Sequence, residues 1–144
     1  MTVAGYEISI DATRLDRDVV HRFLSEESYW ARGVPRDVVD RSIENSLCFG
    51  LYRGRDQVGF ARVVTDRAAI AYLGDVFVLP AHRGRGLGKW LIETVMAHPD
   101  LQGLRRFLLG TADAHSLYER FGFHPLARPE RMMEIASPYE GAEE

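Results

Sequence analysis

The chain has 144 residues, of which 46% are hydrophobic and 27% charged, and its formal net charge is −3 at pH 7. This length suits one domain with a single core, and the composition excludes the disordered and fibrous classes. The slightly acidic balance gives no reason to expect nucleic-acid binding, and no apolar run approaches the roughly 20 residues that a membrane span needs.

The sequence carries no secretory leader pattern, and its single cysteine, Cys48, cannot form an internal disulfide. We therefore expect a cytoplasmic protein. We expect one domain over residues 1–136, followed by a polar tail over residues 137–144. The sequence leaves open whether the chain forms a homodimer.

Hydrophobic periodicity and turn residues predict eleven elements in the order β-α-α-β-β-β-α-β-α-β-β, a mixed α/β fold. The predicted strands are residues 6–11, 47–53, 58–65, 69–79, 104–111, 123–127 and 132–136. The predicted helices are residues 16–28, 36–45, a segment from about 87 that ends at Pro99, and 113–121.

A glycine-rich basic turn links the strand that ends V-F-V-L-P, residues 76–80, to the helix that follows it. Glycine allows positive φ and lets the backbone approach a ligand closely. A helix that begins here directs unpaired N–H groups and the positive end of its dipole into the turn, which favours phosphate. The turn alternates cations with glycines: Arg83, Gly84, Arg85, Gly86, Gly88 and Lys89.

The spacing of this turn separates three kinds of phosphate loop. A Walker A loop would need Ser or Thr where Trp90 stands, and a dinucleotide fingerprint would need one more residue between its glycines. The pattern R-x-x-G-x-G over residues 83–88, after V-x-V-x-P, resembles the pyrophosphate-binding motif of the GNAT N-acetyltransferases. The run L-Y-E-R-F-G-F over residues 117–123 is similar to the L-Y-x-x-x-G-F signature of the same family.

The resemblance implies a central, mostly antiparallel sheet flanked by helices and a fold that binds acetyl-CoA. It implies transfer of acetyl to a primary amine, of a small molecule or a peptide, by direct attack in a ternary complex. Pantetheine would pair with the main chain of Phe77 and Val78, and the amides from Arg83 to Lys89, including that of Leu87, would hold the pyrophosphate. No metal is implied, because no cluster has ligand spacing.

The resemblance also assigns catalytic candidates. Tyr118 matches the tyrosine that donates a proton to the departing sulfur, and the alternative is a core aromatic residue. Thr111 stands where many members have an asparagine that binds pantetheine. Gly74 stands where some members have a glutamate base, so Asp75 is the remaining carboxylate; the alternatives are an ion pair with a nearby arginine and a base that acts through water.

The loop between the first two predicted helices contains Glu27, Tyr29 and Trp30, and in the family this region borders the acceptor site. Aromatic rings and a carboxylate suit a cationic amine. The alternative is that the two rings cap the core. A rival function for the whole chain is a non-catalytic CoA-binding sensor or partner domain.

Overall fold

The computed structural model describes residues 1–139, which form one five-stranded sheet in the order β1-β2-β3-β4-β5. The neighbours pair antiparallel except β4 and β5, which are parallel. The predicted mixed, mostly antiparallel fold is therefore confirmed. The strands are β1 (Glu7–Ser9), β2 (Leu47–Arg53), β3 (Asp56–Thr65), β4 (Ile70–Val78) and β5 (Arg106–Leu109).

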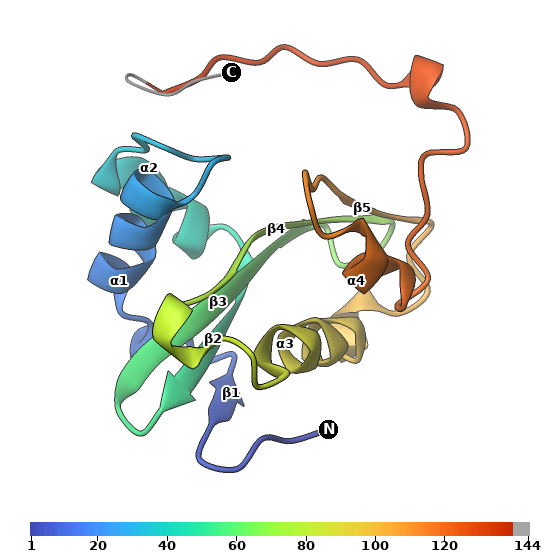
Figure 1. Ribbon diagram of the computed structural model, residues 1–144. Helices are drawn as coiled ribbons and strands as arrows, with labels where there is room; N and C mark the ends of the chain where they lie inside the picture. The colour runs from blue at the N-terminus through green and yellow to red at the C-terminus, as the bar shows by residue number, and fades with distance from the viewer. Residues whose placement is uncertain (140–144) are drawn as a thin grey trace.

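Helices cover both faces of the sheet: α1 and α2 pack on one side, and α3 and α4 on the other (Figure 1). Each side has its own core, with Phe23 and Val39 buried on the first side and Leu91 and Val95 on the second. The helices are α1 (Arg17–Arg22), α2 (Arg36–Glu44), α3 (Leu87–Met96) and α4 (His115–Glu119). Shorter turns are the π-helical Phe23–Glu27 and the 3₁₀ segments Ala12–Arg14, Pro80–His82, Pro99–Leu101 and Pro129–Arg131.

A bulge in β4 shapes the middle of the sheet. Phe77 lies opposite Phe60 and Gly74 opposite Arg62, so β4 carries one residue more than β3 over this stretch. Asp75 sits in the bulge with φ of +54°, a left-handed conformation that non-glycine residues seldom adopt. The last pair between β4 and β5 is Leu73 with Leu109, so β4 leaves β5 where the bulge begins.

Two predictions about the end of the chain are wrong. Residues 123–127 and 132–136 form no strand, and every residue from 124 to 139 is exposed. An alternating pattern alone does not make a strand, which also needs a neighbouring strand to pair with, and within residues 1–139 no strand pairs with these segments. The predicted polar tail reaches past the described residues. No helix within residues 1–139 is long and apolar enough to cross a membrane.

Candidate active site

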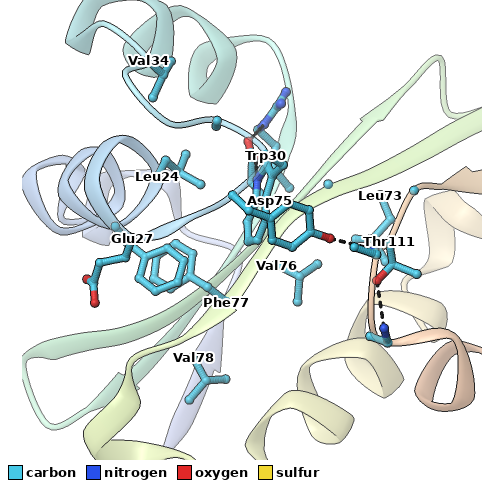
Figure 2. Close-up of a pocket in the computed structure, with 18 of the residues that line it drawn as sticks. Leu24, Glu27, Trp30, Val34, Leu73, Asp75, Val76, Phe77, Val78 and Thr111 are labelled. Atoms are coloured by element: carbon cyan, nitrogen blue, oxygen red, sulfur yellow. Dashed lines mark hydrogen bonds and ion pairs between the residues drawn. The ribbon is translucent and has the colours of Figure 1, made fainter. Parts of the chain in front are cut away.

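A cavity of about 900 Å³ opens where β4 and β5 part. Several regions of the chain line it: residues 23–34 after α1, part of α2, Arg62 of β3, β4 around its bulge, the turn into α3, the segment from the end of β5 into α4, and Tyr139. Figure 2 shows Trp30, Asp75, Phe77, Val78 and Thr111 around this space. The topology thus gathers both sequence motifs and the predicted acceptor loop at one site.

The main chain of β4 beyond the bulge turns toward this cavity. The N–H of Leu79 donates to the carbonyl of Val58 at 2.8 Å, so these residues form a hydrogen-bonded pair of the β3–β4 ladder. Such pairs alternate with pairs that exchange no hydrogen bond, so Val78 directs its N–H and C=O away from β3. Phe77 directs its main chain toward Phe60 on β3. Phe77 and Val78 are the two residues predicted to pair with pantetheine. Only Val78 directs its main chain away from β3, and Phe77 contributes a buried ring instead.

The glycine-rich turn leaves amides unpaired at the start of α3. Gly84 and Gly86 have φ of +81° and +77°, where a side chain would be strained. Gly86 is the N-cap residue, no side chain caps the helix, and the first helical bond runs from the N–H of Trp90 to the carbonyl of Gly86 at 3.0 Å. The amides left for an anion belong to Leu87, Gly88 and Lys89.

The three cations of the turn differ in their contacts. Arg83 donates from Nε to the carbonyl of Val78 at 2.9 Å, which ties the turn to the end of β4. Arg85 and Lys89 are exposed and form no ion pair within residues 1–139. Their charge is therefore available to a phosphate at this turn.

Asp75 is held by two neighbours across the bulge. One carboxylate oxygen accepts from the indole N–H of Trp30 at 2.9 Å, and the other accepts from Nε of Arg62 at 2.8 Å. The Asp75 and Arg62 side chains are only 11% and 20% exposed, and Arg62 also donates to Oγ of Ser46 at 3.1 Å. The ion pair that the sequence left as an alternative is therefore present. The Asp75 carboxylate can accept roughly four hydrogen bonds, of which Arg62 supplies one and Trp30 a second.

Tyr118 lies on α4 and is 9% exposed. It belongs to the core beside α3, where its ring meets that of Phe123 edge to face at 6.0 Å, and it also lines the cavity. Within residues 1–139 its hydroxyl makes no hydrogen bond. Burial raises the pKa of Tyr118 to about 12. The ring therefore packs in the core, and the hydroxyl of this cavity-lining residue stays protonated at neutral pH.

Thr111 is engaged locally. Its hydroxyl oxygen accepts from the N–H of Ala114 at 3.1 Å, which fixes the loop that leads into α4. The hydroxyl proton remains available to a ligand in the cavity.

Two aromatic residues form the wall opposite α4. The hydroxyl of Tyr29 accepts from the N–H of Ala112 at 2.8 Å, so the loop after α1 reaches the segment after β5. The rings of Tyr29 and Trp30 meet edge to face at 5.1 Å, both residues line the cavity, and they are 52% and 42% exposed. The Trp30 ring also lies 6.4 Å from that of the core residue Phe23. Glu27 is exposed at the rim and makes no hydrogen bond or ion pair within the described residues.

Sequence reasoning missed Arg62. It lies within a strand whose neighbours are buried, and a charged side chain in such a strand calls for an opposite charge nearby. That signal indicates a buried ion pair, but it does not identify the partner, because the pairing depends on the register of β3 and β4.

Comparison with known proteins gives the following matches. A family model described as "Acetyltransferase (GNAT) domain" matches residues 44–125. A Gibberella zeae protein, whose name gives acetyltransferase as an inferred activity, is 34% identical over 81% of this chain and 77% of its own.

Solved structures agree with these matches. A crystal structure from Xanthomonas campestris, titled as an inferred acetyltransferase of the GNAT family, is 52% identical over 95% of this chain and 96% of its own, with a TM-score of 0.92. A Clostridium acetobutylicum structure determined with acetyl-CoA is 13% identical over 91% of this chain and 94% of its own, with a TM-score of 0.68, which shows the fold alone. Within residues 1–139, no three His, Cys, Asp or Glu residues gather as metal ligands would.

Proposed function

The chain belongs to the GNAT family of acetyltransferases, and on that premise we propose that it transfers acetyl from acetyl-CoA to a primary amine. The amine attacks directly, with both substrates bound. One observation carries the proposal: the outward main chain of Val78 and the uncapped start of α3 line one cavity.

The residues of the cavity and of the turn beside it fit acetyl-CoA. The amides at the start of α3, with Arg85 and Lys89 beside them, suit a pyrophosphate. The outward N–H of Val78 suits an amide or a carbonyl of an extended arm, because it repeats the contact that a neighbouring strand would make. The hydroxyl of Thr111 adds a donor on the opposite wall.

Acetyl-CoA supplies an activated thioester, and the side chains of this chain handle the protons. The amine nitrogen forms a bond to the carbonyl carbon as the carbon–sulfur bond breaks. The N–H of Val78 donates to the carbonyl oxygen, where negative charge develops. Tyr118 donates from its hydroxyl to the departing sulfur. Asp75 takes the proton of the amine, directly or through one water, and the bonds from Trp30 and Arg62 fix its orientation.

The charges around the acceptor side favour a cationic amine. Arg62 neutralises Asp75, whereas Glu27 and Asp113 line the cavity with no ion-pair partner within residues 1–139. The rings of Tyr29 and Trp30 can face an ammonium group. The net negative wall would attract such an acceptor in its protonated form.

We expect Glu27→Gln to raise the KM for a cationic amine several-fold and to leave kcat and the affinity for acetyl-CoA unchanged. The variant removes the attraction between the carboxylate and the ammonium group, which acts equally in the bound substrate and in the transition state. Initial-rate kinetics with varied amine concentration measure this split. Glu26→Gln is the matched control, since Glu26 is the preceding residue and does not line the cavity. An unchanged KM in the Glu27 variant would remove this residue from the acceptor site.

We expect Asp75→Asn to depress kcat/KM most at low pH, with the defect shrinking toward the pKa of the amine, where the substrate arrives deprotonated. The variant also breaks a largely buried ion pair, so stability should drop by about 3 kcal/mol. A pH–rate series and a thermal melt separate the two effects. Ser46→Ala serves as control, because it removes the other bond of Arg62 and leaves Asp75 intact. A profile parallel to that of the parent would exclude the base role.

A panel of primary amines, scored by thiol release from acetyl-CoA, tests the proposed function. Small polyamines, amino sugars and short peptides sample the acceptor classes that the sequence leaves open. Release above the rate without amine, with at least one acceptor, is the expected result. Tight CoA binding by calorimetry with no release from any acceptor would instead favour the CoA-binding sensor.

A further inference from the structure

An arginine that lines the large cavity has hydrogen-bond donors that its neighbours do not use. Arg62 is 20% exposed, and its guanidinium donates from Nε to Asp75 and from Nη1 to Ser46. Nη2 makes no hydrogen bond within residues 1–139, where the only fully buried side-chain nitrogen or oxygen without a partner is the hydroxyl of Tyr52. Nη2 therefore reaches open space, and the space that Arg62 lines is the cavity.

The other arginine of the cavity is engaged at the phosphate turn. Arg83 donates from Nε to the carbonyl of Val78, at the end of β4. The remaining charged side chains that line the cavity are carboxylates, those of Glu27, Asp75 and Asp113. Arg62 is thus the cation available to an anionic group on the acceptor side, and it lies 2.8 Å from the carboxylate of Asp75.

Asp75 and Arg62 present a negative and a positive charge side by side. A ligand that complements both carries an ammonium and a carboxylate a few bonds apart, which is the pattern of an amino acid. The ammonium would meet Asp75, whose oxygens each keep a lone pair beside the bonds from Trp30 and Arg62. The carboxylate would accept from Nη2 of Arg62 in a charge-assisted bond.

The wall of the cavity formed by α1, α2 and the loop between them is largely apolar. Figure 2 shows Leu24 and Val34 on this side of the cavity. Val38 and Ser42 line the cavity from α2, where they lie one helical turn apart and therefore share a face. Walls of this kind favour an aliphatic or aromatic substituent over a polar one.

We propose that the acceptor is an amino acid with an apolar side chain, an inference that rests on the proposed function. The acetyl group passes from sulfur to the amino nitrogen. The ammonium gives up two protons, of which one ends on the thiol of CoA and the other passes through Asp75 to solvent. The carboxylate is unchanged by the reaction and stays bound to Arg62, and the side chain packs against Leu24 and Val38.

Leucine, leucinamide and 3-methylbutylamine test the carboxylate site, because they share a side chain and differ in the group beside the amine. Leucine is expected to show a kcat/KM about tenfold or more above that of either analogue, since only its carboxylate forms a charge-assisted bond with Arg62. Leucinamide has the less basic amine, so reactivity alone would favour it. An equal or higher kcat/KM for either analogue would overturn the carboxylate site and leave acetyl transfer to amines standing.

Arg62→Lys separates binding of the carboxylate from support of Asp75, because lysine keeps the charge and lacks the planar pair of terminal nitrogens. We expect the ratio of kcat/KM for leucine to that for 3-methylbutylamine to fall several-fold. A purely structural role would lower both values and keep their ratio, and that outcome would overturn the proposal. Arg17→Lys is the matched control and should keep the ratio, since Arg17 is also an ion-paired, 30% exposed arginine but does not line the cavity.

Calorimetry with the CoA-bound protein separates this proposal from the proposed function. Leucine is expected to bind about tenfold or more tightly than leucinamide, glycine or glutamate, whether or not acetyl is transferred. Such binding without transfer to any amine would contradict the proposed function and retain the amino acid site. If leucine shows no preference over these ligands, the amino acid site is overturned, even where other amines are acetylated.

Discussion

Tyr118→Phe is expected to lower kcat by about 10²-fold or more while the affinity for acetyl-CoA stays nearly constant. The change keeps the ring that packs on Phe123 and removes only the hydroxyl, which makes no hydrogen bond within residues 1–139. Because the pKa of Tyr118 is about 12, the hydroxyl stays protonated from neutral to moderately alkaline pH and always offers a donor to sulfur. Stopped-flow or steady-state thiol release measures the loss.

The raised pKa of Tyr118 also bears on whether its hydroxyl proton is transferred fully to the departing sulfur. A thiol has an ordinary pKa near 8.5, well below that of Tyr118, so complete transfer to the sulfur would be uphill. In the proposed mechanism Tyr118 therefore remains a hydrogen-bond donor to the departing thiolate, and we expect no fall of the rate through its ionisation below about pH 10. Tyr52→Phe is the control, because Tyr52 is also buried with a raised pKa but lies outside the cavity. If Tyr118→Phe lowers thermal stability but leaves kcat unchanged, Tyr118 has no part in catalysis and serves only to pack the core.

Gly86→Val is expected to weaken CoA binding tenfold or more. Each charge-assisted hydrogen bond to the pyrophosphate contributes roughly 1.5–3 kcal/mol, and a valine at φ of +77° would both strain the turn and crowd the amides beyond it. Calorimetry with CoA gives the affinity directly.

The control for Gly86→Val is Gly103→Val. Gly103 has φ of +69° in open space before β5, so its variant carries similar backbone strain away from the turn. The Gly103 variant is expected to lose stability and keep its CoA affinity. Equal CoA affinities in the parent and the Gly86 variant would refute the assignment of the phosphate turn.

The features that sequence reasoning could predict are local. The turn between β4 and α3 is formed by residues adjacent in the chain, and glycine at positions 84 and 86 indicates positive φ without knowledge of the fold. The L-Y-x-x-x-G-F run placed Tyr118 on a short helix that Gly122 ends, and the structure has that helix one turn shorter than predicted, at His115–Glu119.

The features that sequence reasoning could not predict depend on register. The bond between Asp75 and Arg62 needs the extra residue in β4, and the outward main chain of Val78 needs the pairing of Leu79 with Val58. Alternating patterns near the C-terminus predicted two strands, but a strand forms only where another strand is positioned to pair with it. The helix predicted over residues 16–28 instead changes to a π-helical turn at Phe23.

The most direct measurement is the mass of the amine product. Parent enzyme is incubated with acetyl-CoA and each amine that releases thiol, and the acetylated amine and the free thiol are quantified in the same sample. We predict equal amounts of both, only when both substrates are present, and a loss of both in Tyr118→Phe. Bound acetyl-CoA that releases thiol without an acetylated amine, or that yields none with any acceptor, would contradict acetyl transfer to a primary amine.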